Sequence, residues 1–257
     1  MKGEGRGLTR APSGKGTGMG PEAVLLDVGG VFLLPDVRHL ARAFAAAEIP
    51  EPSDDCFHDA HYRAAARFAV DVDVDADWVG SWRRYLEDYA LACVEHLDEA
   101  VDLDELHRHL DSEFADAALW TSPIPGAAEG LRRLADTGVR LGVISNADGL
   151  MAQRLREREI LQVGPGAGVE VECVIDSGDV GVMKPDPRIF RMALEAMAVE
   201  PGSAWYLGDM PAFDVVGARR ADLRPWVIDP LRLHLDRDYD RVGSLEELAQ
   251  RISSAPG

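Results

Sequence analysis

The chain has 257 residues, 46% of them apolar and 28% charged, and this composition excludes a disordered, collagen-like or membrane-spanning protein. Its 45 acidic residues outnumber the 27 basic ones, and the resulting net charge of −18 argues against sequence-independent binding to nucleic acid. The length predicts either one large domain or a core with a second module.

Three features bear on where the protein resides. The first twenty residues are rich in glycine and lack the apolar stretch of a signal peptide, so residues 1–20 are predicted to form a disordered tail. No later apolar run approaches the roughly 18 residues of a transmembrane helix, so we expect no membrane association. Cys56, Cys93 and Cys173 form neither a disulfide pattern nor a CxxC metal pattern, which fits a reducing cytoplasm.

The first strand is predicted over residues 23–27, an apolar run that ends on Asp27 and continues into Gly29 and Gly30. The segment that follows contains no comparable strand. It contains helical patterns at 40–47, 62–70, 78–97 and 103–117, which predict an all-helical insert over residues 36–118.

Beyond a Pro-rich connector at 121–126, the pattern alternates between helix and strand. This alternation predicts a parallel sheet covered on both faces, an α/β core made of residues 21–35 and 119–257. Helices are expected at 127–136, 151–158, 187–198, 215–221 and 245–252, and strands at 139–144, 171–175, 204–207 and 225–228.

Polar side chains follow the predicted strands at the points where the strands end. Ligands of parallel sheets bind beyond the carboxyl ends of the strands, so we expect these residues to converge on one crevice. They are Asp27 after the first strand, Ser145 and Asn146 after the second, Asp176 after the third, and Gly208 and Asp209 after the fourth.

The acidic residues of this set suit either nucleophilic or metal chemistry. Asp27 can act as a nucleophile or a metal ligand, and Gly29 and Gly30 let a substrate approach the backbone beside it. A plain Asx turn that closes the strand explains Asp27 equally well. Asp209 and Asp214 are spaced to surround a hard cation, for which Mg²⁺ is the usual choice, although Asp214 could also be a helix cap.

One cation stands out by its rarity. Lys184 is the only lysine outside the tail, in a chain that otherwise uses arginine, and it precedes the sequence Pro185-Asp186-Pro187 that would start a helix. Ser145 and Asn146 can offer a hydroxyl and backbone N–H groups near a helix start, a suitable place for a phosphoryl oxygen.

Four segments, taken in order, resemble the haloacid dehalogenase (HAD) superfamily of aspartyl-nucleophile phosphohydrolases. They are LLDVGGV (25–31), VISNA (143–147), SGDVGVMKPDPRIF (177–190) and YLGDMPAFDVVGA (206–218). The third is the most distinctive, and the resemblance extends from Glu22 to about Asp229. It implies a Rossmann-like, doubly wound core of the IA type with a helical C1-type cap placed over the site.

The resemblance also implies a role for each residue of the predicted site. Asp27 would attack phosphorus and become an aspartyl phosphate, while Ser145 and Lys184 would hold the phosphoryl oxygens. Mg²⁺ would be bound by Asp27, by Asp209 and by the backbone carbonyl of Gly29, with Asp214 supporting the metal site from close by.

Gly29 departs from the family pattern, in which most phosphatases carry a second aspartate two residues after the nucleophile. That aspartate protonates the leaving group and then activates water, and its loss costs on the order of 10²- to 10⁴-fold in rate. Three alternatives remain: a leaving group that needs little protonation, as in a sugar 1-phosphate or acyl phosphate; an acid supplied by the cap; or lost catalysis.

We therefore predict a cytoplasmic, Mg²⁺-dependent phosphohydrolase that acts on a small phosphorylated metabolite, with substrate and oligomeric state left open. The alternative is a catalytically weak or silent relative that binds a ligand or protein in the same pocket. A dehalogenase would usually lack the Gly208–Asp209 pair, and a phosphonatase would need a lysine in the insert.

Aromatic and histidine residues of the insert are predicted to be structural. Trp78, Trp82, Tyr85 and Tyr89 recur at helical spacing, which favours the insert's own core over a substrate platform. The histidines of this region form no convincing zinc set, so surface or packing roles are expected for them. They are His39, His58, His61, His96, His107 and His109.

Overall fold

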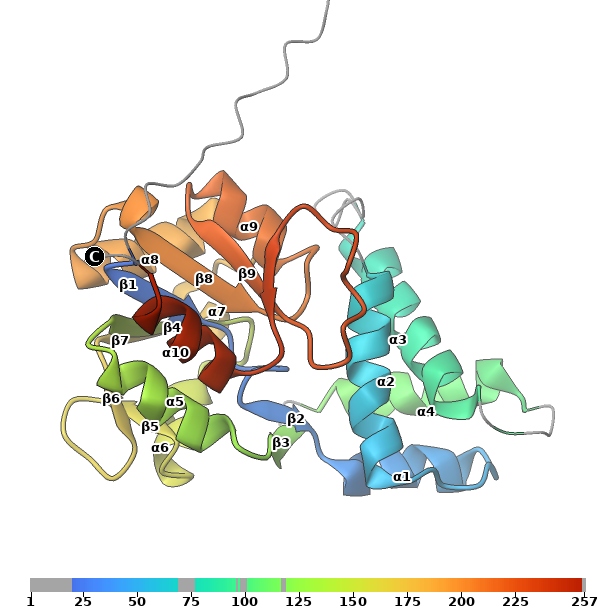
Figure 1. The fold of residues 1–257 in the computed structure, drawn as a ribbon. Coiled ribbons are helices and arrows are strands. Elements are labelled where there is room, and N and C mark those ends of the chain that lie inside the picture. Colours follow the sequence, from blue (N-terminus) through green and yellow to red (C-terminus); the bar gives the residue numbers. More distant parts are fainter. Residues whose placement is uncertain (1–19, 69–76, 96, 98–100, 117–118, 256–257) are drawn as a thin grey trace, which may run out of the picture.

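The computed structural model describes residues 20–68, 77–95, 97, 101–116 and 119–255. Figure 1 shows two parts, an α/β core and a group of helices beside it. The predicted tail lies outside the described residues except for Gly20.

The core is built on a parallel six-stranded sheet with β1 (Ala23–Leu26) near its centre, flanked by β8 (Ala204–Gly208) and β4 (Arg140–Ser145). All strand pairs of this sheet are parallel, which confirms the predicted α/β fold class. In spatial order the strands are β10 (Asp240–Val242), β9 (Arg224–Ile228), β8 (Ala204–Gly208), β1 (Ala23–Leu26), β4 (Arg140–Ser145) and β7 (Cys173–Asp176).

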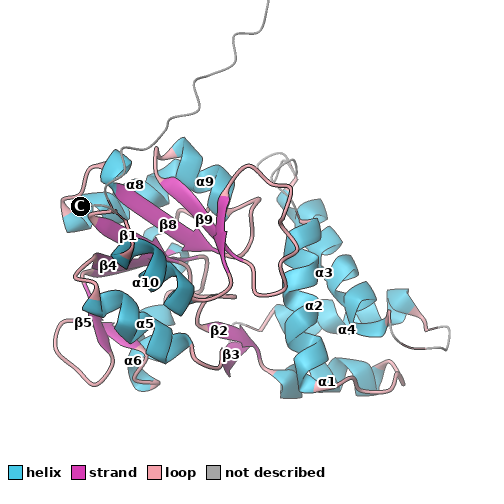
Figure 2. Cartoon of the chain, in the orientation of Figure 1, coloured by secondary structure: helices cyan, strands magenta, loops and turns pink. Residues whose placement is uncertain are grey.

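Helices cover both faces of this sheet (Figure 2). Alternate residues of β1 explain why, because Val24 and Leu26 pack into one hydrophobic cluster while Ala23 and Leu25 pack into another. The first cluster includes α5 (Ala127–Asp136), α6 (Met151–Glu157) and α10 (Leu245–Ser253), and the second includes α8 (Pro187–Met197) and α9 (Asp214–Arg220).

The helical insert has a hydrophobic core of its own. Its helices are α1 (Val37–Ala46), α2 (Asp54–Arg67), α3 (Trp78–Val94) and α4 (Leu103–Phe114). Tyr85 and Tyr89 are fully buried in this core, as predicted, whereas the side chain of Trp78 and all of His96 lie outside the described part of the chain.

A short antiparallel ribbon connects the insert to the core. It pairs β2 (Leu33–Pro35) with β3 (Trp120–Pro123), where only a connector was expected from the sequence. Other short elements that the sequence analysis missed are β5 (Leu161–Val163), β6 (Val169–Val171), α7 (Ser177–Val180) and the edge strand β10.

The insert also packs directly against the loop that follows β8. Ala212 and Phe213 of that loop belong to the insert's hydrophobic cluster, and the rings of Phe68 and Phe213 lie 5.4 Å apart. The insert therefore sits beside the carboxyl end of a central strand.

No helix in the described ranges is long and apolar enough to cross a bilayer.

Candidate active site

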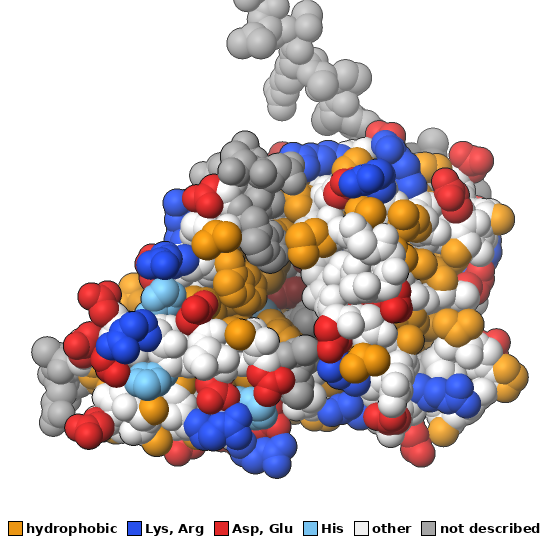
Figure 3. All heavy atoms as spheres, turned by 180° about the vertical axis from the view of Figure 1, so that it is seen from behind, with side chains coloured by type: hydrophobic (Ala, Val, Ile, Leu, Met, Phe, Trp, Pro, Cys, Tyr) orange, Lys and Arg blue, Asp and Glu red, His pale blue; other side chains and the backbone are white. Residues whose placement is uncertain are grey.

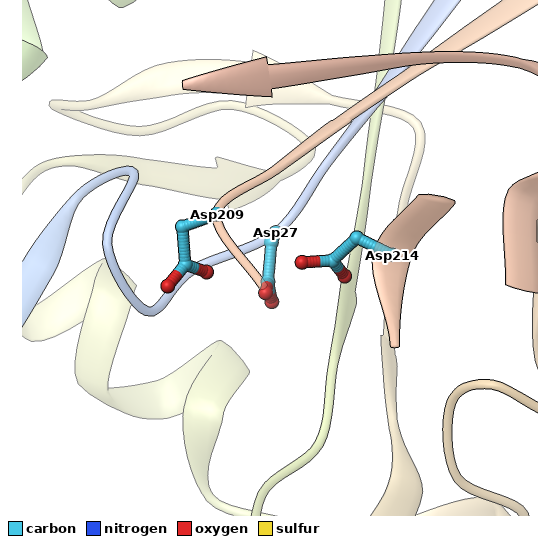
Figure 4. A group of neighbouring side chains, drawn as sticks. All are labelled: Asp27, Asp209 and Asp214. Atoms are coloured by element: carbon cyan, nitrogen blue, oxygen red, sulfur yellow. The ribbon is translucent and has the colours of Figure 1, made fainter. Parts of the chain in front are cut away.

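Three predicted acids meet at the carboxyl ends of the central strands. Asp27 follows β1, Asp209 follows β8 and Asp214 begins α9, and one carboxylate oxygen of each lies within 4.8 Å of the others. Figure 4 shows Asp27 between the other two. All three side chains are buried, so their negative charges are poorly solvated.

Lys184 reaches the same place from the loop before α8. Its Nζ lies 2.6 Å from Asp27 Oδ2 and 2.8 Å from Asp214 Oδ1, and it donates a hydrogen bond to the Tyr206 hydroxyl at 2.9 Å. Asn146 holds the backbone of this lysine, because its amide donates to the Lys184 carbonyl at 3.1 Å and accepts from the Lys184 N–H at 2.7 Å. The Asn146 side chain thus positions Lys184.

The electrostatics of this cluster favour an added cation. Burial raises the pKa of Asp27 to about 8, with Lys184 opposing the shift and Asp214 and Asp209 adding to it. Burial alone would lower the pKa of Lys184, but attraction to Asp214 and Asp27 outweighs that effect and raises it. Three carboxylates face one ammonium group, and their oxygen atoms are the donors that Mg²⁺ prefers.

Two glycines allow the acids to come this close. Gly30 has φ +64°, and an added Cβ there would lie 2.5 Å from Asp209 Cγ. An added Cβ at Gly208 would lie 2.3 Å from Asp214 Cγ. Side chains at either position would therefore displace a site carboxylate.

Gly30 was predicted to let a substrate approach the backbone, but its carbonyl already has a partner from the insert. The hydroxyl of Tyr62, on α2, donates a hydrogen bond to the Gly30 carbonyl at 2.8 Å. The insert is therefore hydrogen-bonded to the loop that follows the Asp27 strand.

Gly29 occupies the position at which the family pattern places a second aspartate. An added Cβ at Gly29 would lie 3.2 Å from Trp120 Cζ3 and 3.4 Å from Cε3. Trp120, at the start of β3, therefore packs closely against Gly29, and its ring would have to shift slightly to admit a side chain at this position.

His61 is a residue near the site that sequence reasoning did not identify. It is fully buried on α2, as a packing role requires, but its Nε2 lies 2.7 Å from Asp209 Oδ2 without the alignment of a hydrogen bond. Its Nδ1 pairs with the Tyr85 hydroxyl at 2.8 Å. Its place on the apolar face of α2, next to Ala60 and Ala64, was the available signal.

One expected role of Asp176 and one alternative for Asp214 are not observed. Asp176 does not line the pocket, because its carboxylate accepts hydrogen bonds from the Met151 and Gly178 N–H groups at two helix starts. Asp214 is not the N-cap of α9, since Phe213 occupies that position. Both Asp214 oxygens are engaged, one by Lys184 and the other by the Met210 N–H at 2.8 Å.

A pocket of about 320 Å³ opens onto these residues between the core and the insert. Asp27, Gly29, Ser145, Asn146 and Lys184 line it on the core side, together with Asp209 and Asp214. Trp82 packs against the insert's hydrophobic core, as predicted, and also lines the pocket. The remaining walls are mostly apolar.

Two curated phosphatases are similar to this chain in sequence. The phosphoserine phosphatase of Thermus thermophilus is 35% identical over 178 residues, which make up 67% of this chain and 66% of that protein. The phosphoglycolate phosphatase of Rhodospirillum rubrum is 32% identical over 133 residues, 52% of either chain. This chain thus spans about half to two thirds of the length of these curated relatives.

A solved structure and a family model extend the similarity to most of the chain. The HAD phosphatase of Thermococcus onnurineus has the same fold, with a TM-score of 0.50 and 22% identity over 91% of this chain and 98% of that one. The family model of haloacid dehalogenase-like hydrolases matches residues 21–222, which include the three acids, Ser145 and Lys184. The chain therefore belongs to the haloacid dehalogenase-like hydrolase family.

Proposed function

We propose that this protein is a Mg²⁺-dependent phosphohydrolase that removes phosphate from a small phosphorylated metabolite. The observation that carries the proposal is the buried group of Asp27, Asp209 and Asp214 with Lys184 within 2.6 Å of Asp27. The named activities of the two curated relatives, on phosphoserine and phosphoglycolate, support the same class of reaction.

The proposed reaction has two steps on Asp27. A carboxylate oxygen of Asp27 attacks phosphorus, the bond from phosphorus to the ester oxygen breaks, and the alcohol oxygen leaves and takes a proton from solvent. Water then cleaves the aspartyl phosphate, which frees inorganic phosphate and restores Asp27. Lys184 offsets the repulsion between Asp27 and the phosphoryl oxygens, and the Ser145 hydroxyl binds one of those oxygens.

The donor set fits the proposed metal. Asp27 and Asp209 would hold Mg²⁺ with the carbonyl of Gly29, and Asp214 would support them through Lys184. When bound, Mg²⁺ would neutralise negative charge on the phosphoryl group. The fit rests on the excess of buried carboxylates over cations at the centre of the pocket.

The proposed setting is a reducing cytoplasm. Cys56, Cys93 and Cys173 form no disulfide bond, and Cys93 and Cys173 are buried. Burial raises the pKa of the Cys93 and Cys173 thiols, which keeps them in the unreactive protonated form.

Phosphate release from a panel of phosphorylated metabolites, measured with Mg²⁺ and with a chelator, tests the proposal. We expect release in the presence of Mg²⁺ and its loss in the presence of the chelator. No release from any substrate would contradict the proposal and favour a silent ligand-binding protein, the alternative that Gly29 leaves open.

Replacing Asp209 by Asn should weaken Mg²⁺ binding by at least about 10- to 100-fold, since the amide lacks the charge of a metal-binding carboxylate. Isothermal titration calorimetry on the purified protein measures this affinity without any substrate. Asp238→Asn is the matched control, because Asp238 is exposed and lies outside the pocket. Equal Mg²⁺ affinity in the two variants would remove Asp209 from the metal site.

A further inference from the structure

We infer that the substrate is an aryl phosphate, the phosphate ester of a neutral phenol-type alcohol. The inference rests on the proposed function and adds the chemistry of the leaving group. Three separate features of the pocket support it: its walls, its charges and the contact between Gly29 and Trp120.

The walls of the pocket are aromatic and apolar. Trp82 and Phe114 line it from the insert, Trp120 lines it from the connecting ribbon, and Met210 and Phe213 line it from the loop after β8. Figure 3 shows the molecule hollowed between its two parts, with hydrophobic side chains gathered on the insert side of the hollow. Such walls favour a planar aromatic group, which gains both apolar burial and ring contacts.

The charges of the pocket leave no cation for a second anionic group. Among the described residues that line the pocket, the basic ones are Lys184 and Arg154. Lys184 is held by Asp27 and Asp214, and Arg154 makes two hydrogen bonds to Asp148, at 2.6 and 2.8 Å. A carboxylate like that of phosphoserine or phosphoglycolate would lose its hydration here without gaining a free cationic partner.

The contact between Gly29 and Trp120 selects the leaving group by its acidity. Glycine has no side chain that could donate a proton at position 29, and the ring of Trp120 packs closely against it. A phenol, with a pKa of about 10 as in tyrosine, leaves as its anion far more readily than an alkyl alcohol. An aryl ester therefore needs much less help from the missing acid than an alkyl ester does.

Among the described residues of the insert, one carboxyl group lines the pocket and could serve as the proton donor that position 29 lacks. Asp116 lines the pocket, but its side chain is half exposed and lies 3.8 Å from His39 Nδ1. His61, although close to Asp209, does not line the pocket. Asp116 is therefore the residue to test as an alternative proton donor.

Four substrates separate the contribution of the ring from that of the leaving group. Phenyl phosphate combines both, benzyl phosphate has the ring with an alkyl leaving oxygen, acetyl phosphate has a good leaving group without a ring, and phosphoserine has neither. We expect kcat/KM for phenyl phosphate to exceed that for benzyl phosphate by about 10²- to 10⁴-fold, and phosphoserine to be the poorest substrate.

Variants of Trp82 test the aromatic wall. Trp82→Leu should raise KM for phenyl and benzyl phosphate by about 3- to 10-fold and leave KM for acetyl phosphate unchanged. Trp82→Phe keeps a ring on the pocket and should stay close to the parent protein. Val79→Ala, also on α3 but 72% exposed and outside the pocket lining, is the control for the helix itself.

The outcomes are distinguishable. If the protein hydrolyses phosphoserine as efficiently as phenyl phosphate, the aryl assignment is overturned while the proposed function stands. The same conclusion follows if Trp82→Leu leaves KM unchanged for both aromatic esters. If benzyl phosphate is hydrolysed as efficiently as phenyl phosphate, and this activity is lost in Asp116→Asn, the insert supplies a proton donor. That result would also overturn the aryl assignment. No phosphate from any of the four, acetyl phosphate included, would overturn the proposed function and this inference together.

Discussion

The Asp27→Asn protein should release phosphate at least about 10⁴-fold more slowly than the parent, or not measurably, because the amide cannot form the aspartyl phosphate. Its fold should persist. Burial raises the pKa of Asp27 to about 8, so the charged form of this side chain is disfavoured. The neutral amide avoids the cost of burying a charge; it gives up the ion pair with Lys184 but can keep the hydrogen bond from the Val28 N–H. The free energy of unfolding should therefore change little.

Rapid-quench mass spectrometry of the protein during turnover is the direct measurement for Asp27. The parent should carry a phosphoryl adduct on the peptide that contains Asp27, and the Asn variant should carry none. Thermal unfolding of both proteins controls for folding. Turnover in the variant within tenfold of the parent would mean that another group attacks phosphorus.

Lys184→Met should lower kcat/KM by about 10²- to 10³-fold, the usual loss when one group that stabilises transition-state charge is removed. It should also destabilise the metal-free protein by about 3 to 5 kcal/mol, since Asp27 and Asp214 would remain buried without their ammonium partner. Kinetics with phenyl phosphate and urea unfolding measure the two effects separately.

Lys184→Arg is the informative companion to that variant. The site is closely fitted, with Nζ bound to Asp27, Asp214 and Tyr206 and the side chain 3% exposed, so a larger planar guanidinium should not restore activity. Unchanged kinetics in Lys184→Met would show that the ammonium group takes no part in the reaction.

The sheet was predictable because its central strands are short apolar runs and because helical patterns separate them along the chain. The pattern placed β1, β4, β8 and β9 within a few residues of their observed bounds. The ribbon of β2 and β3 was not predictable in the same way, because its strands have three and four residues and both end in proline. Its pairing depends on the whole insert bringing two distant segments together.

The residues of the site differ in the same way in how far the sequence predicts their positions. Asp27 and Asp209 follow strand ends, and Lys184 and Asp214 stand in local motifs close to helix starts, so the sequence alone indicated that the four meet. His61 and Trp82 reach the site from the insert, and Trp120 reaches it from the connecting ribbon. None of the three belongs to such a motif, and their positions depend on how the insert packs on the core. Periodicity identifies the apolar face of a helix but does not identify what that face meets.

The contacts between α2 and the core make the insert and the catalytic loops parts of one thermodynamic system. Tyr62 is bonded to the Gly30 carbonyl and His61 lies against Asp209, so the site has its complete form only while the insert is docked. Suppose that a ligand binds more tightly when the insert is docked on the core. Ligand binding then raises the docking equilibrium constant by the same factor by which docking raises the affinity for the ligand. A mutation far out on the insert that weakens docking would then lower apparent substrate affinity, although it touches no atom of the substrate.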